Sequence, residues 1–166
     1  MTDRTDVPRT GGEREQLRAY LDFHRDTLAL KCAGLSDDDL RRRTTPSSLS
    51  LLGLVRHMAE VERAWFRRVT DGQDVPLVWS PDGDFQAAYD ATDADVAEAF
   101  EAWRNEMEHG RRIERAAESL DVTGVDRRSG GEYSLRRVPV HLIQEYARHN
   151  GHADLIREGI DGTVGV

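Results

Sequence analysis

A glutamate and two histidines follow one another at helical spacing near the end of the chain, in the stretch EYARHNGHADLIRE (145–158). Glu145, His149 and His152 are separated by steps of four and three residues, which place side chains on one face of an α-helix. Apolar residues continue this row on both sides, so the helix would bury the three polar groups in its core-facing stripe. The apolar members are Val138, Leu142, Ile156 and Ile160.

A shared metal ion would explain why these groups face the core. An isolated buried carboxylate costs several kcal/mol unless it is paired or ligates a cation. Glu145 and His149 lie one helical turn apart, so both side chains can reach one ion. His57 offers a third ligand, because it lies on the apolar row of an earlier helical segment, GLVRHMAEVE. These three residues are the predicted ligands, a two-histidine, one-carboxylate set typical of catalytic zinc and non-haem iron.

Four segments with helical periodicity must position these residues. They extend over about 13–33, 51–69, 92–120 and 134–161, and a Ser-Asp-Asp-Asp run after the first indicates a short helical turn. No segment shows a convincing strand pattern. The sequence therefore predicts an all-α protein, most simply a four-helix bundle whose helix order stays open. We expect one domain over 13–166, preceded by a flexible N-terminal tail over 1–12.

The segment between the second and third predicted helices is rich in Gly, Pro and Asp, and loops of this length are often functional. Its aromatic residues Trp79, Phe85 and Tyr89 are candidates for the wall of an entrance to the site. His152 and His24 are further candidates to orient a ligand or bind substrate, with a plain structural role as the alternative for each.

Composition restricts the partners that the protein can have. The chain has 31 acidic and 23 basic residues and a net charge of −8, which argues against nucleic acid and anionic membranes as partners. No apolar stretch approaches the roughly 18 to 20 residues of a membrane span, and the first ten residues lack a signal-peptide core. We therefore expect a cytoplasmic protein. Cys32 is the single cysteine and lies on an apolar row, so it is interpreted as core, and a metal must be held by histidine and carboxylate.

The two stretches that carry the candidate ligands resemble a known superfamily. SLSLLGLVRHMAEVERAWFRR (48–68) and SLRRVPVHLIQEYARHNGHADLIREGIDG (134–162) are similar to the second and fourth helices of the DinB/YfiT-like superfamily, in particular its uncharacterised actinobacterial branch. KCAGLSDDDLRRR (31–43) fits the end of the first helix, so the resemblance covers nearly the whole chain. It implies a four-helix bundle in up-down-down-up order, frequently a homodimer, with a divalent metal near one end.

In many members of this superfamily three histidines hold the metal, one on the second helix and an H-x-x-x-H pair on the fourth. His57 and His149 match two of these positions, and Glu145 replaces the third, as in the similar mycothiol-dependent maleylpyruvate isomerases with their two histidines and one glutamate. The resemblance implies zinc first, with nickel, iron or manganese as alternatives, and a low-molecular-weight thiol such as mycothiol. It further implies a thiol S-transferase or isomerase in which an open metal position activates the thiolate toward a small electrophile.

Three alternatives remain open. The first is a non-catalytic bundle of the stress-associated kind, whose metal only holds helices together. The second is a di-iron carboxylate bundle, for which Glu106 and His109 form the one credible E-x-x-H pair on a helix. The third is a dimerising helical protein without metal, in which Glu145 hydrogen-bonds directly to His57 and His149.

Overall fold

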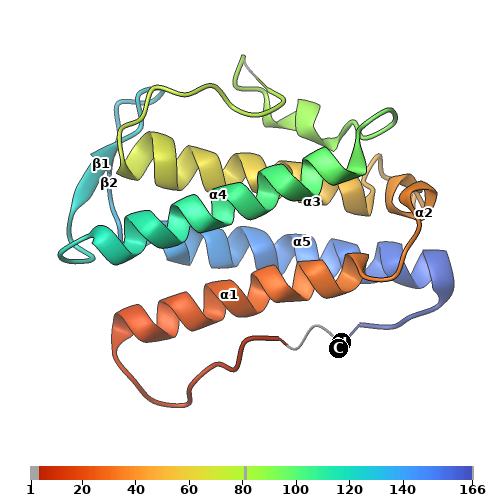
Figure 1. The fold of residues 1–166 in the computed structure, drawn as a ribbon, viewed down its shortest axis with the longest axis horizontal. Coiled ribbons are helices and arrows are strands. Elements are labelled where there is room, and N and C mark those ends of the chain that lie inside the picture. Colours follow the sequence, from red (N-terminus) through yellow and green to blue (C-terminus); the bar gives the residue numbers. More distant parts are fainter. Residues whose placement is uncertain (1–3, 81, 166) are drawn as a thin grey trace.

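Four long helices lie side by side in the computed structural model, which describes residues 4–80 and 82–165 (Figure 1). Helix α1 packs along α5, α3 packs along α4, and α3 also contacts α5. The chain is mainly helical, as predicted, and the short turn after α1 is the helix α2. The helices are α1 (Glu13–Cys32), α2 (Asp37–Arg41), α3 (Leu51–Glu62, continued by the π-helix η1, Arg63–Thr70), α4 (Val96–Ala116) and α5 (Arg137–Asp161).

Capping side chains determine where several helices begin. Ser50 accepts a hydrogen bond from the Gly53 amide at the start of α3. At α4 the cap is Asp95, whose side chain accepts a hydrogen bond from the Glu98 amide at 2.9 Å, so the helix begins about one turn after the predicted residue 92. It ends at Ala116, about one turn before the predicted residue 120. Both predicted ends are therefore wrong. Helix α5 ends where predicted, because Gly162 adopts the left-handed conformation (φ 79°) that terminates helices.

The second long helix changes its hydrogen-bonding pattern before it ends, which the sequence pattern did not predict. It is α-helical to Glu62 and π-helical in η1, where the Asp71 amide bonds to the Phe66 carbonyl five residues earlier at 3.0 Å. Such wide turns are frequent at functional sites. Phe66 is buried against Gly110 of α4, where a Cβ atom would lie 2.6 Å from the ring. The close approach of η1 to α4 therefore requires a glycine.

A two-stranded antiparallel hairpin joins α4 to α5, so the prediction of a polar turn without strands is wrong. Strands β1 (Thr123–Val125) and β2 (Glu132–Ser134) pair with Thr123 opposite Ser134. Each strand has only three residues, which is too short for an alternating pattern to be recognised. At Gly124 the hairpin lies so close to η1 that a Cβ atom would overlap the Val69 carbonyl oxygen. The hairpin is thus packed directly against η1.

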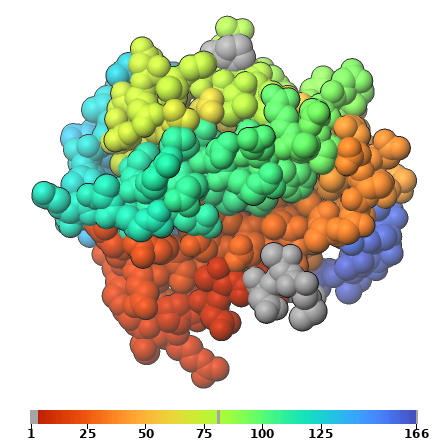
Figure 2. Space-filling model, viewed as in Figure 1, coloured from red at the N-terminus to blue at the C-terminus, as the bar shows by residue number. Residues whose placement is uncertain are grey.

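The long segment between η1 and α4 lies along α3 and contains the 3-10 helix η2 (Phe85–Tyr89) (Figure 1). Two polar side chains of α3 hold it there. Buried Glu60 accepts hydrogen bonds from the Trp79 amide (2.8 Å) and the Ser80 hydroxyl (2.9 Å), and Arg56 donates to the Asp90 carbonyl (2.7 Å). Figure 2 shows this segment and α4 next to each other on the upper part of one face, with the N-terminal part of the chain below them. The loop is therefore fixed to the helix that carries His57.

The expected tail over residues 1–12 lies partly outside the described residues. From residue 4 to residue 12 the chain forms no helix or strand. Thr5 nevertheless bonds to the Asp26 carboxylate of α1 through its amide (2.8 Å) and its hydroxyl (2.7 Å). Among the described helices, none combines the length and apolar character needed to cross a membrane.

Candidate metal centre

Helices α3 and α5 bring the three predicted ligands together. Oε2 of Glu145 lies 3.5 Å from Nε2 of His149 and 3.9 Å from Nε2 of His57. The two imidazole rings are 4.7 Å apart between centroids. His57 and His149 are 7% and 5% exposed, whereas Glu145 is partly exposed. Within the described residues, this is the one group of three or more histidine, cysteine or acidic side chains arranged so that it could hold a metal ion.

Unsatisfied buried atoms indicate that a group from outside the chain completes this cluster. Neither ring nitrogen of His57 has a hydrogen-bond partner in the described part of the protein. The oxygen-to-nitrogen distances of 3.5 and 3.9 Å are too long for hydrogen bonds. They are close to the separation of about 3.4 Å expected between two ligands of a tetrahedral ion with bonds of about 2.1 Å. The residues present therefore fit a divalent metal ion.

Burial keeps both histidines in the neutral form that binds metals. It lowers the pKa of His57 to about 4 and outweighs the opposing effect of the Phe85 backbone. Burial also lowers the pKa of His149 to about 3, with the nearby His57, His152 and Arg148 acting in the same direction. Near neutral pH the imidazole lone pairs are therefore free to bind a cation.

Two of the alternatives from the sequence do not fit these contacts. Glu145 is too far from His57 and His149 to form the direct hydrogen bonds of the metal-free network. The proposed di-iron pair is engaged elsewhere. Glu106 accepts hydrogen bonds from Arg63 and Arg67 at 2.6–3.1 Å, and His109 contacts Arg112 at 2.7 Å. Glu106 therefore forms ion pairs within the protein.

Aromatic residues of η2 form a wall beside the cluster, as expected for two of the three loop aromatics. The Tyr89 ring stacks on His57 with centroids 4.6 Å apart, and its hydroxyl lies 3.4 Å from Nε2 of His149. The Phe85 ring meets His57 edge-on at 6.3 Å. This arrangement depends on Gly53, because a Cβ atom there would lie 2.8 Å from the Tyr89 carbonyl oxygen. Loop and helix are thus closely packed at the site.

Two further histidines of α5 contact the candidate ligands. Nδ1 of His152 lies 3.3 Å from Nδ1 of His149, on the opposite side of that ring from Glu145. His152 is therefore placed to orient the His149 ring rather than to bind the same ion. Sequence reasoning did not single out His141, whose Nε2 lies 3.7 Å from Oε1 of Glu145. The helical spacing could have identified His141, because it lies four residues before Glu145 and therefore on the same side of the helix.

The other candidates from the sequence lie elsewhere, since no described contact joins His24 or Trp79 to the cluster. His24 of α1 accepts a hydrogen bond from the Asn150 side chain at its carbonyl oxygen (3.0 Å). Trp79 packs under the guanidinium group of Arg56, whose central carbon is 4.7 Å from the ring centroid. Cys32 is buried, which raises the pKa of its thiol to about 12, so it belongs to the core as expected.

A comparison with known protein families identifies the relatives of this chain. A family model described as mycothiol S-transferase matches residues 16–162. This family is part of the DinB/YfiT-like superfamily, so the resemblance recognised in the sequence is confirmed. No curated protein matches the sequence.

Proposed function

This chain belongs to the mycothiol S-transferase family, and from that premise we propose that it is a divalent-metal-dependent transferase that joins a thiol such as mycothiol to a small electrophile. The observation that carries the proposal is the convergence of His57, Glu145 and His149, with both ring nitrogens of buried His57 unsatisfied. The family match supports thiol transfer, and the cluster supplies a place at which a metal can act.

Three protein ligands are the number found at catalytic zinc sites, whereas structural zinc sites usually have four. His152 contacts His149 at the nitrogen that faces away from Glu145, so it does not provide a fourth ligand from that position. When bound by these three residues, a zinc ion would lower the pKa of a thiol that occupies its open position and keep it as the reactive thiolate. This count favours an enzyme over a bundle whose metal has only a structural role.

The remaining steps belong to the chain's own residues. Cys32 cannot act as the nucleophile, because its buried thiol remains protonated at neutral pH. The sulfur must therefore come from the cosubstrate. The Tyr89 hydroxyl lies beside Nε2 of His149 and faces the cluster, where it can donate a hydrogen bond to a reacting group. Phe85 and the Tyr89 ring shield the neighbouring His57 from water.

We also propose the up-down-down-up order for the four long helices. In Figure 1 the colours show α1 and α5 running in one direction and α3 and α4 in the other. This pattern supports the up-down-down-up order of the DinB-like bundle. A homodimer in the cytoplasm remains the expectation from the family resemblance and from the sequence.

Metal analysis combined with thiol consumption tests this function. Wild-type protein should retain about one zinc ion per chain and should speed the loss of mycothiol when mixed with a panel of electrophiles. The His149→Ala variant should lose both properties. Cys32→Ala is the matched control, since it removes the chain's own thiol and leaves the cluster intact. Full metal occupancy in both His57→Ala and His149→Ala, or equal mycothiol consumption by His149→Ala, would contradict the proposal.

A further inference from the structure

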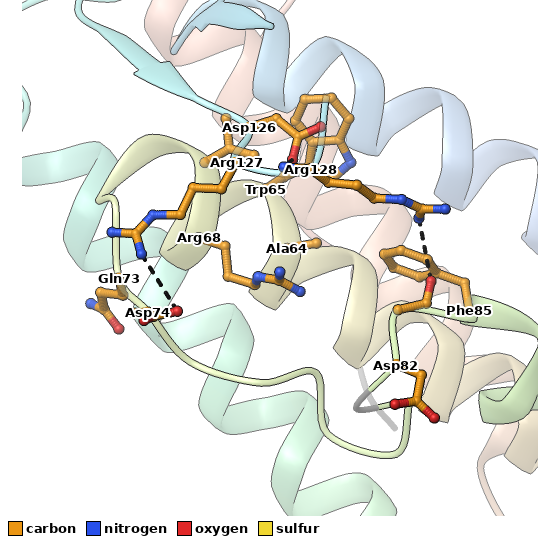
Figure 3. Close-up of a pocket in the computed structure, with 12 residues that line it drawn as sticks. Ala64, Trp65, Arg68, Gln73, Asp74, Asp82, Phe85, Asp126, Arg127 and Arg128 are labelled. Carbon is orange, nitrogen blue, oxygen red and sulfur yellow. Dashed lines mark hydrogen bonds and ion pairs between the residues drawn. The ribbon is translucent and has the colours of Figure 1, made fainter. Parts of the chain in front are cut away.

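A cavity of about 370 Å³ lies between η1, the loop that follows it and the turn of the β1–β2 hairpin (Figure 3). Trp65 and Phe85 line it. The Trp65 ring lies 4.4 Å from His141, which contacts Glu145, and the Phe85 ring lies 6.3 Å from His57. Phe85 thus lies between the cavity and His57, and Trp65 and His141 lie between the cavity and Glu145. Its volume lies within the range of small-molecule sites.

Two arginines of the hairpin turn are already engaged at the rim of this cavity. Arg127 donates to the Gly72 carbonyl (2.8 Å) and lies 3.5 Å from the Asp74 carboxylate. Arg128 donates to the Gly83 carbonyl at 3.3 Å. Figure 3 shows these arginines reaching from the hairpin turn toward the loop. Their contacts connect the two segments and shape the cavity, so neither guanidinium is fully available to a ligand.

Arg68 differs from Arg127 and Arg128 in the contacts of its guanidinium group. It extends from η1 among the residues that line the cavity (Figure 3) and is only partly exposed. Within the described part of the chain it makes no hydrogen bond or ion pair. The positive charge of Arg68 contributes to lowering the pKa of the Asp126 carboxyl, although the hydrogen bond from the Ser129 hydroxyl has the larger effect. A partly buried guanidinium with five donors and no direct partner is available to a ligand.

The chemistry of the lining indicates what kind of ligand fits. A site for a polyanion would have an excess of cationic groups, and a site for an apolar molecule would lack charges. Here three arginines are balanced by three aspartates, and aromatic rings stand beside them. Neighbouring hydroxyl groups on a ring can accept from a guanidinium and donate to a carboxylate, while the C–H face of the ring packs on an aromatic side chain. The charged residues are Arg68, Arg127, Arg128, Asp74, Asp82 and Asp126.

We propose that this cavity binds the polyhydroxylated ring portion of the thiol cosubstrate, with Arg68 as its main hydrogen-bond donor. The choice of thiol rests on the proposed function, because mycothiol carries its cysteine on an amino sugar joined to a cyclitol. With the sugar and cyclitol in the cavity, the cysteine arm passes Trp65 and Phe85 to reach the metal centre. The π-helix η1 supplies Trp65 and Arg68 together, which gives this irregular segment a function.

Calorimetric titration with the thiol-free compound glucosaminyl-inositol tests the cavity without any turnover. The wild-type protein should bind it saturably, and Arg68→Ala should weaken binding about tenfold or more, as expected for the loss of charge-assisted hydrogen bonds. Arg104→Ala is the matched control, because it removes the same charge from an exposed position on α4 outside the cavity. Since Arg68 makes no hydrogen bond in the described chain, both variants should fold, and circular dichroism verifies this.

Three results would overturn the assignment: no saturable binding by the wild type, equal affinity in Arg68→Ala, or displacement by inorganic phosphate alone, which would identify an anion site instead. His149→Ala should bind glucosaminyl-inositol normally, because this compound has no thiol. Arg68-dependent binding without mycothiol consumption would reject the proposed function and keep the cavity assignment. Consumption of mycothiol without such binding would reject the cavity assignment alone.

Discussion

Two groups of buried polar side chains lie on the same pair of helices, and they differ in whether the protein satisfies them. Glu62 of α3 and Tyr146 of α5 belong to a network that Arg25 of α1 completes. His57 of α3 and Glu145 of α5 belong to the candidate metal cluster, in which neither ring nitrogen of His57 has a hydrogen-bond partner in the described chain. The two groups use neighbouring positions, so burial alone does not distinguish a structural network from a ligand site.

The network around Glu62 is satisfied at nearly every atom. Arg25 donates to both carboxylate oxygens of Glu62 at 2.8 and 2.7 Å. The Tyr146 hydroxyl donates to Glu62 at 2.9 Å and accepts from the Trp103 indole at 2.7 Å. Burial acts to lower the pKa of Arg25, but the adjacent Glu62 outweighs it and raises that pKa above its ordinary value. Between these two groups, the completed hydrogen bonds distinguish the structural network from the candidate site with its unsatisfied His57 ring.

Breaking the satisfied network should have the largest effect. Arg25→Met leaves the Glu62 carboxylate buried without its ion-pair partner, and the free energy of unfolding should fall by about 3–5 kcal/mol. Urea denaturation measures this, and the loss should be the same with and without zinc. Arg18→Met is the control, because its pair with Glu114 is partly exposed and worth about 1 kcal/mol or less. A loss below about 1 kcal/mol for Arg25→Met would show that the network is dispensable.

Completing the unsatisfied cluster should have the next largest effect. Zinc at about 100 times its dissociation constant should raise the free energy of unfolding by about 2.7 kcal/mol, because it binds only the folded state. Thermal unfolding with zinc and with a chelator measures the difference. His149→Ala should show no such increase, whereas Tyr146→Phe should keep it. Equal stabilisation of the wild type and His149→Ala would place the metal elsewhere.

Removing one hydroxyl from the network should cost less than either of these. Tyr146→Phe leaves the buried Trp103 N–H without its acceptor, and stability should fall by about 2 kcal/mol in urea denaturation. Tyr89→Phe provides the comparison at the cluster. Its hydroxyl makes only a 3.4 Å contact with His149, so the loss there should be smaller. A larger loss at Tyr89 than at Tyr146 would reverse the distinction between the two groups.

The smallest effect at neutral pH is expected for His57→Leu in metal-free protein. Its ring nitrogens have no partners, so their removal should change stability by less than about 1 kcal/mol. The pKa of His57 falls from 6.5 to about 4 on folding. Metal-free wild type should therefore lose stability as the pH drops from 6.5 toward 4, because the unfolded state binds a proton that the folded state excludes. His57→Leu should weaken this dependence, and an unchanged pH profile in urea denaturation would argue against the neutral, buried imidazole.

Much of the candidate site was predictable because its ligands follow a local rule. Glu145 and His149 are one turn apart on α5, and His57 stands on an apolar row of α3, so their inward orientation is visible in the residue spacing. His141 obeys the same spacing but was not recognised, because its role depends on Trp65 and Glu145 being beside it. His24 also lies on an inward row, yet it faces Asn150 and not the cluster.

The elements that escaped prediction are those stabilised by contacts distant in sequence. The strands of the hairpin have three residues each, and Gly124 allows them to approach η1. The π-helical turn at the end of α3 accompanies the packing of Phe66 on Gly110. Neither feature has a periodicity of its own, because each depends on a neighbour more than 40 positions away in the chain.

The sequence by itself determined the mainly helical class, the histidine and carboxylate donors and the alignment of Glu145 with His149, since helix periodicity follows from hydrogen bonds within a few residues. Only the tertiary structure decided that His57 meets them across α3 and α5, that Tyr89 stacks on His57, and that a cavity forms around Arg68. These contacts join segments far apart in the chain, and side-chain packing between helices, loop and hairpin determines which of them form.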